Sequence, residues 1–138
     1  MKHYINKFIV IMILLFSFFQ LHAQTSTLNF TLNSDKVKIS GHSTEIESTI
    51  KKIENNLVWT QYVNGKTKII KFTITDNTEN WDRETSLGSI FYTMPLEGHT
   101  CNLKLIGLES EITATLTIRI SNRQEEHYIF NISSINYQ

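Results

Sequence analysis

Apolar and polar residues alternate along several short stretches of this sequence, and this two-residue period restricts the fold more than any other feature. Successive side chains of a β-strand point to opposite faces, so the alternation predicts strands with one buried face. Shorter runs cover residues 28–32, 36–39, 90–94, 101–105 and 128–132. The longest run, residues 112–120, has these predicted inward positions: Ile112, Ala114, Leu116, Ile118 and Ile120.

The dipeptide Asn64-Gly65 lies between two strand-like runs and is the sharpest turn signal in the chain. Both central residues of a type I′ turn need a positive φ angle, which asparagine and glycine adopt readily. A two-residue loop also fixes the register of the hairpin, and one face of the ribbon then collects its large apolar residues. The predicted pairs are Val63 with Lys66, Gln61 with Lys68, Trp59 with Ile70, and Leu57 with Phe72.

Residues 45–56 depart from the alternation. A two-residue period would place Ser48 and Lys52 on the same face as Ile50, where burial of polar groups is unfavourable. A helix-capping sequence also opens the segment, and Asn55-Asn56 is a plausible stop. We therefore expect one short amphipathic helix over about residues 45–56, with a stripe of apolar residues at helical spacing: Ile46, Ile50, Ile53 and Leu57.

Two polar segments are expected to be turns or loops. Asn33-Ser34-Asp35 would join the strands on either side of it into a hairpin. Residues 75–86 are predicted to form a polar loop whose one large apolar residue is Trp81. A loop tryptophan either contacts a ligand or partner, or folds back to close the edge of a barrel or sandwich.

These elements predict a mainly β fold, an antiparallel β-sandwich or barrel of roughly six to eight strands with one short helix at 45–56. Residues 24–138 have the length of a single β-rich domain. The inward positions are mostly Ile, Leu, Phe and Trp, with Ala114 the exception, so a filled core is favoured over a ligand cavity.

Residues 1–23 have the pattern of a secretory signal peptide. Lys2 and Lys7 form a short basic start, residues 8–19 are almost wholly apolar, and Leu21-His22-Ala23 provides a cleavage site. The apolar run is shorter than the roughly 20 residues that a spanning helix needs. We therefore expect a secreted or periplasmic product with no stable membrane anchor after cleavage.

Cys101 is the only cysteine, so no intramolecular disulfide can form. Its place in an alternating run predicts a small buried core residue. His99 and Cys101 could lie on one face of a strand, which makes them weak candidates for a metal site. Two ligands are too few to predict a metal, and we expect no cofactor.

Nothing in the sequence predicts a catalytic residue. No G-x-S-x-G motif occurs, and an inward Cys101 is a poor nucleophile, so an enzyme with a hydrolytic or metal site is the minority hypothesis. The formal net charge is zero and no polybasic run is present, which argues against nucleic acid as a partner. The candidate ligand-binding residues are large aromatic ones: Trp59, Tyr62, Trp81 and Phe91.

Three short stretches resemble the YceI-like polyisoprenoid-binding proteins, which are exported antiparallel β-barrels around a long apolar chain. They are Ser40-Gly41-His42-Ser43-Thr44, Arg83-Glu84-Thr85-Ser86-Leu87 with the following Phe91-Tyr92 and Pro95, and Leu116-Thr117-Ile118. The resemblance implies a carrier or sequestering role for an amphiphile, without catalysis.

The sequence therefore predicts an exported, non-enzymatic binding or interaction module. Its partner would be an apolar or lipid-like small molecule held within the β-structure, or an envelope protein at the surface. The alternative is a structural or inhibitor-type protein-interaction domain with a filled core. The volume enclosed by the inward side chains distinguishes these hypotheses.

Overall fold

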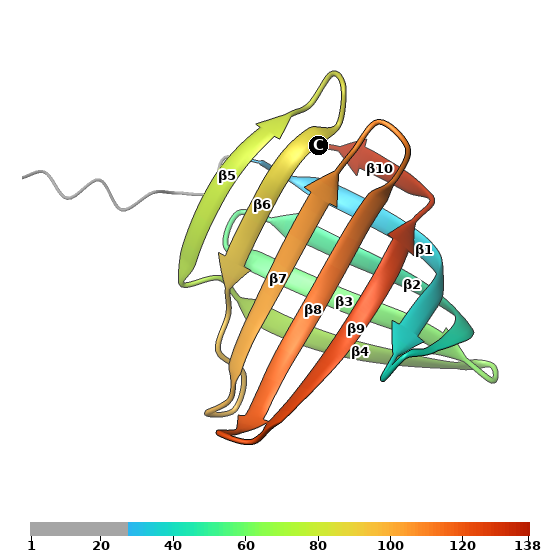
Figure 1. Ribbon diagram of the computed structural model, residues 1–138, viewed down its shortest axis with the longest axis vertical. Coiled ribbons are helices and arrows are strands. Elements are labelled where there is room, and N and C mark those ends of the chain that lie inside the picture. The colour runs from blue at the N-terminus through green and yellow to red at the C-terminus, as the bar shows by residue number, and fades with distance from the viewer. Residues whose placement is uncertain (1–27) are drawn as a thin grey trace, which may run out of the picture.

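The computed structural model describes residues 28–138, and every regular element in this range is a β-strand (Figure 1). None of the described residues belongs to a helix long and apolar enough to cross a lipid bilayer. The strands are β1 Phe30–Ile39, β2 His42–Ile53, β3 Asn56–Val63, β4 Lys66–Thr73, β5 Asp76–Asp82, β6 Leu87–Thr93, β7 Thr100–Gly107, β8 Ile112–Ser121, β9 Gln124–Ile132 and β10 Ser134–Tyr137.

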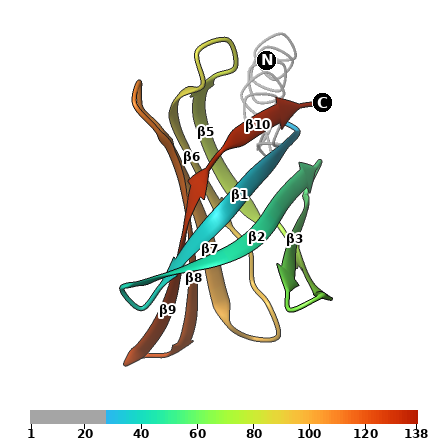
Figure 2. The same ribbon diagram turned by 90° about the vertical axis from the view of Figure 1, so that its right-hand side faces the viewer.

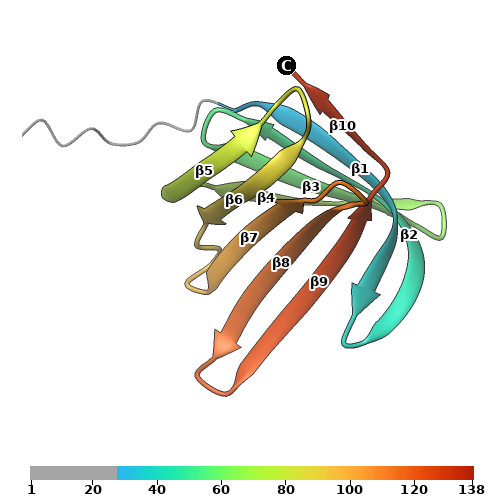
Figure 3. The same cartoon turned by 45° about the horizontal axis from the view of Figure 1, so that its top comes forward.

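All ten strands belong to one antiparallel sheet with the order β4-β3-β2-β1-β9-β8-β7-β6-β5, and β10 pairs with β1. β4 and β5 follow one another in the chain, yet they lie at opposite ends of this order. The sheet curls, so that a wall of β1 to β4 faces a wall of β5 to β9 (Figures 1 and 2). Figure 3 shows β5 to β9 in front and β1 to β4 behind them. The result is an open half-barrel.

β1 joins the two walls because it changes partner along its length. Its first half pairs with β10, and its second half pairs with β9. The change coincides with a register shift against β2 between Ser34 and Lys36. Ser133, between β9 and β10, donates from its backbone N to the carbonyl oxygen of Asn33 at 2.8 Å and so bridges the two pairings. The expected turn at residues 33–35 is therefore wrong, since these residues form a bulge within one continuous strand.

The concave face of the sheet carries the hydrophobic core. Burying a large apolar side chain stabilises a fold by roughly 1.5–3 kcal/mol, so a core of this size dominates the stability of a chain without disulfides. Cys101 is fully buried, as its alternation predicts. The core residues are Leu28, Phe30, Leu32, Val37, Ile50, Leu57, Trp59, Phe72, Ile74, Ile90, Tyr92, Met94, Cys101, Leu103, Leu105, Ala114, Leu116 and Phe130.

Aromatic side chains from opposite walls meet across the interior. Trp59 on β3 approaches Phe130 on β9, with 5.4 Å between ring centroids, and Tyr128 on the same strand, at 5.0 Å. Phe30 on β1 stacks with Tyr92 on β6 at 6.4 Å. Because the walls touch at these two positions, the interior there is filled by side chains.

The hairpin at Asn64-Gly65 confirms the predicted turn and register. Asn64 and Gly65 have φ angles of 51° and 73°, as a type I′ turn requires. Leu57, Trp59 and Phe72 lie on the buried face. The observed pairs are Val63 with Lys66, Gln61 with Lys68, Trp59 with Ile70, and Leu57 with Phe72.

The helix expected at residues 45–56 is wrong. This segment forms most of β2, then a turn in which Glu54 has a φ of 53°, and the start of β3. Ser48 and Lys52 are buried beside Ile50. The segment therefore follows the two-residue period of a strand, although this places two polar residues on the buried face. Lys52 is tolerated because its amine donates a hydrogen bond to the carbonyl oxygen of Leu28.

The expected loop at residues 75–86 is also wrong in its first half, where β5 pairs with β6 along its whole length. The fold is mainly β and antiparallel as predicted, but with ten strands in place of six to eight and a strand in place of the helix. In β8 the predicted inward face holds as far as Ile118, whereas Ile120 is exposed. The register of β8 against β9 shifts between Arg119 and Ser121, and this irregularity interrupts the alternation at Ile120.

Candidate functional sites

The four aromatic candidates from the sequence do not form one site. Trp59 lies in the core, and its indole Nε1 has no hydrogen-bond partner among the described residues. Tyr62 and Phe91 are exposed on the outer face of β3 and β6, which belong to opposite walls. Trp81 is half-buried on the inner face of β5. The structure therefore separates these residues by face and by wall.

Trp81 folds back and helps to close one end of the half-barrel. Its Nε1 donates to the hydroxyl of Tyr137 on β10 at 2.7 Å, and Ser86 Oγ lies 2.9 Å from the same hydroxyl. The guanidinium of Arg83 lies 5.0 Å from the centroid of the Tyr137 ring. Of the two roles considered for a tryptophan in this segment, these contacts correspond to edge closure.

Gly107 on β7 provides the space for this closure. A Cβ atom at this position would lie 1.9 Å from the carbonyl oxygen of Ser86 and 2.6 Å from Cη2 of Trp81. Neither distance is compatible with a side chain. The glycine thus allows the turn between β5 and β6 to lie against β7.

His99 and Cys101, the weak metal candidates, have no third potential metal ligand near them among the described residues. Cys101 Sγ approaches the backbone oxygen of His99, at 4.0 Å, and burial raises the pKa of the Cys101 thiol. Among residues 28–138, no three His, Cys, Asp or Glu side chains lie close enough together to hold a metal ion. The thiol is thus in the environment of an inert core cysteine.

A polar cluster inside the half-barrel was not predicted from the sequence. Lys52 on β2 is fully buried, and its Nζ lies 5.5 Å from the ring centroid of Tyr92. The hydroxyl of Tyr92 donates to Oε1 of Glu79 on β5 at 2.7 Å. Burial lowers the pKa of Lys52, and the charge of Glu79 opposes that shift. The cluster links β2 in one wall to β5 and β6 in the other.

One sequence signal could have revealed this cluster. A two-residue period in the segment around Ile50 puts Lys52 on the inner face, and the alternation of β6 puts Tyr92 there as well. Glu79 gives no comparable signal, because the inward positions of β5 are Asn77, Glu79 and Trp81, and two of these three are polar.

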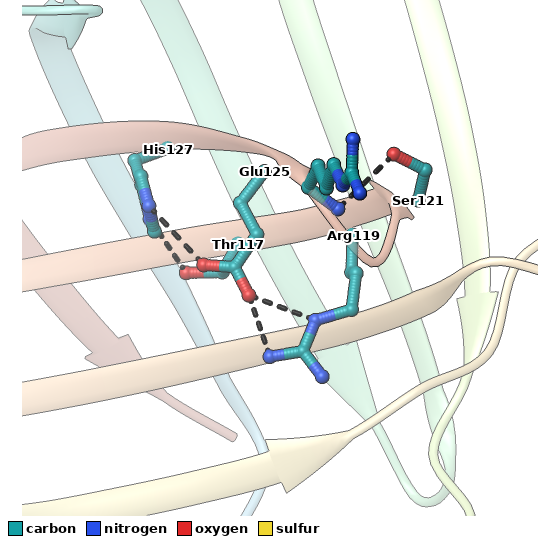
Figure 4. A network of polar contacts seen from close by, with 6 residues as sticks. Thr117, Arg119, Ser121, Glu125 and His127 are labelled. Carbon is teal, nitrogen blue, oxygen red and sulfur yellow. Dashed lines mark hydrogen bonds and ion pairs between the residues drawn. The ribbon is translucent and has the colours of Figure 1, made fainter.

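A second polar network lies on the outer face of β8 and β9 (Figure 4). The Thr117 hydroxyl lies 3.1 Å from Nδ1 of His127, whose Nε2 lies 3.5 Å from Oε2 of Glu125. Arg119 holds the other carboxylate oxygen of Glu125 through Nε at 2.8 Å and Nη2 at 2.6 Å. An open depression of about 520 Å³ adjoins Arg119 and Glu125 at the β8–β9 turn.

In this network, Thr117, His127 and Glu125 follow one another in the order of a nucleophile, a base and an orienting acid. Its environment differs from that of a catalytic triad, since the His127 side chain is 51% exposed and stands on an open sheet face. Electrostatic stabilisation of a transition state depends on fixed dipoles in a site that excludes water. Cross-strand hydrogen bonding is therefore the simpler role for Thr117, Glu125 and His127.

The exposed apolar side chains gather on the β3–β4 hairpin more than elsewhere. Tyr62, Val63 and Ile69 lie there, and Ile69 is 57% exposed. The hairpin also carries Lys66 and Lys68 beyond its turn, and Figure 1 shows it at the margin of its wall. Tyr62 and Ile69 share its outer face, which makes that face a candidate contact surface.

No protein-family model matches the sequence, and no curated protein resembles it at a significant level.

Proposed function

We propose that this chain is an exported, non-enzymatic binding module that recognises a macromolecular partner through its outer surface. The observation that carries this proposal is the contact of aromatic rings across the interior. Trp59 meets Phe130, and Phe30 meets Tyr92, so side chains occupy the space that an apolar ligand would need at both positions. Because the interior is filled at these two positions, we expect a partner to bind outside the half-barrel.

Two further observations support binding over catalysis. Cys101 is buried with a raised pKa, and the Thr117–His127 pair is open to water. Export rests on the signal-peptide pattern of residues 1–23, which lie outside the described residues. An envelope protein or another exported protein is therefore the expected class of partner.

Native mass spectrometry of the protein purified from its own compartment tests this proposal. We expect the chain to be found with a second polypeptide and without an apolar small molecule. A matched sample that has been unfolded, extracted with organic solvent and refolded serves as the control, and it should rebind the same polypeptide. A small apolar molecule bound in equal stoichiometry, and lost on extraction, would overturn the proposal.

The second candidate is a carrier of an amphiphile, the role implied by the resemblance to YceI-like proteins. The interior cluster of Lys52, Tyr92 and Glu79 favours it, because an anionic head group could pair with the buried amine. The same mass spectra decide between the candidates. If an amphiphile is found, Lys52→Met should release it, whereas Lys104→Met on the outer face should not.

A further inference from the structure

β4 is an edge strand, with β3 as its one hydrogen-bonded neighbour among the described strands. Edge strands present a row of unpaired backbone N–H and C=O groups that can pair with another extended chain. The side chains of β4 are also largely exposed, apart from Ile70 and Phe72. Its backbone is therefore open to strand addition along a length of eight residues.

Three lysines make this edge basic on both faces. The register places Lys66 and Lys68 on the same face as the buried Phe72, whereas Lys71 lies on the outer face with Ile69. Within the described residues, the side-chain amines of these three lysines form no ion pair or hydrogen bond. The positive charge of β4 is therefore uncompensated.

The hairpin itself contains no acidic residue. No Asp or Glu occurs between Glu54 and Asp76, a stretch that contains the whole hairpin. Like charges oppose pairing of β4 with a second β4, so a symmetric dimer through this edge is disfavoured. An acidic chain would be attracted instead.

The outer face of the hairpin adds apolar surface and a hollow. Ile69 and Tyr62 are 57% and 46% exposed. A depression of about 410 Å³ lies further along the hairpin from its turn, and its lining includes Val58 and Lys71. An added strand could place an apolar side chain there while its backbone pairs with β4.

We propose that β4 accepts an extended acidic segment of a partner protein by strand addition. This inference rests on the proposed function and names the surface and the chemistry of its partner. An extended segment is favoured over an anionic bilayer, because it can reach lysines on both faces of the ribbon and pair with the unpaired backbone. A bilayer offers neither an alternating pattern of charge nor backbone partners.

The test uses the folded chain and capped peptides of about ten residues, a length that spans the strand. One peptide carries glutamate on both faces of its extended form, and a second has lysine in place of each glutamate. A third keeps the glutamates but has proline at alternate positions, which removes backbone donors. Binding is followed by the amide NMR signals of the protein.

We expect the glutamate peptide to shift the signals of β4 and its neighbour β3, and to leave those of β8 unchanged. The lysine and proline peptides should bind at least about tenfold more weakly, because each lacks one part of the interaction. In the protein, Lys68→Glu with Lys71→Glu should reverse the preference between the glutamate and lysine peptides. Lys104→Glu changes an exposed lysine on β7, which has a paired strand on each side, and this control variant should change little.

The proposal is overturned by equal binding of the three peptides, by shifts confined to other strands, or by no binding. Binding to vesicles of phosphatidylglycerol and phosphatidylcholine without binding to the peptide would also overturn it, in favour of a membrane surface. Failure of the proposed binding function can be distinguished from failure of the β4 proposal. If a native partner still binds the Lys68→Glu, Lys71→Glu protein, the proposed function stands but β4 is not the binding surface. If no partner is found at all, both the proposed function and the β4 proposal fail.

Discussion

Trp59 and Phe130 meet edge to face across the half-barrel, with ring planes at 84° to one another. They belong to β3 and β9, which are separated in the sheet by β2 and β1. Their contact is therefore a direct link between the two walls, independent of the backbone ladder. Edge-to-face pairs add roughly 0.5–1.5 kcal/mol to the burial of the rings themselves.

Replacing either ring should destabilise the fold strongly. We expect Trp59→Ala or Phe130→Ala to lower the free energy of unfolding by about 3–5 kcal/mol, because each leaves a cavity between the walls. Urea denaturation followed by circular dichroism measures this change. Phe91→Ala, on the outer face, is the matched control and should cost about 1 kcal/mol or less. Equal effects at the three positions would contradict the wall-to-wall role.

Tyr128 should make stability depend on pH in the alkaline range. Burial and the hydrogen bond to Glu126, at 2.8 Å, raise its pKa to about 12 from a usual value of 10.0. The unfolded chain then loses this proton at lower pH than the folded chain, so the stabilisation is complete below pH 10 and is lost as pH rises toward 12.

Allowing for the partial exposure of Tyr128, the loss should be about 1–2 kcal/mol. Urea midpoints across this range measure it, and Tyr128→Phe should flatten that part of the profile. Tyr62→Phe removes an exposed hydroxyl and is the control. A Tyr128→Phe profile as steep as that of the parent would contradict the assignment.

Gly107→Ala should disturb the closed end of the half-barrel. The added methyl group would overlap the carbonyl oxygen of Ser86 and the ring of Trp81, which forces either the strand or the turn to move. We expect a loss of about 1–3 kcal/mol in unfolding free energy. The near-ultraviolet circular dichroism of Trp81 should change as well. Gly98→Ala, where a Cβ meets no atom within 4 Å, reports the cost of backbone strain at its positive φ alone.

The thiol of Cys101 should resist modification in the folded protein. It is fully buried and its pKa is raised, so both access and thiolate content are low. We expect an aromatic disulfide reagent to react at the rate of unfolding in native buffer and at once in denaturant. Rapid reaction of the native protein at neutral pH would show that β7 opens locally.

The elements predicted correctly are those determined by neighbours in the sequence. The hairpin at Asn64-Gly65 depends on two residues that favour positive φ and on alternation at each side, and its register follows by counting. The alternation of β8 is equally local, and it fails only at Ile120, where a bulge intervenes. The burial of Cys101 also follows from the alternation of its own strand.

The elements missed depend on residues distant in the chain. The polar character of Lys52 argues against a buried face, and the sequence does not show that Leu28 and Tyr92 lie beside its amine. β5 lacks an apolar alternation of its own and is a strand because β6 pairs with it throughout. The edge position of β4 depends on the order of the whole sheet, so the sequence alone does not show that its exposed lysines lie on a free edge.

The partner change of β1 has a consequence for the order in which the chain can assemble. β1 to β4 and β5 to β9 are each joined by neighbouring hairpins that can form as soon as they are made. β1 needs β9 and β10 on its second side, and Asn33 meets Ser134 from 101 positions away. β1, the first of the described strands to leave the ribosome or a translocation channel, is thus the last to be fully paired. Until β9 emerges, the meander of β1 to β4 has no partner wall and its apolar face stays exposed, which makes it a natural client for a holding chaperone.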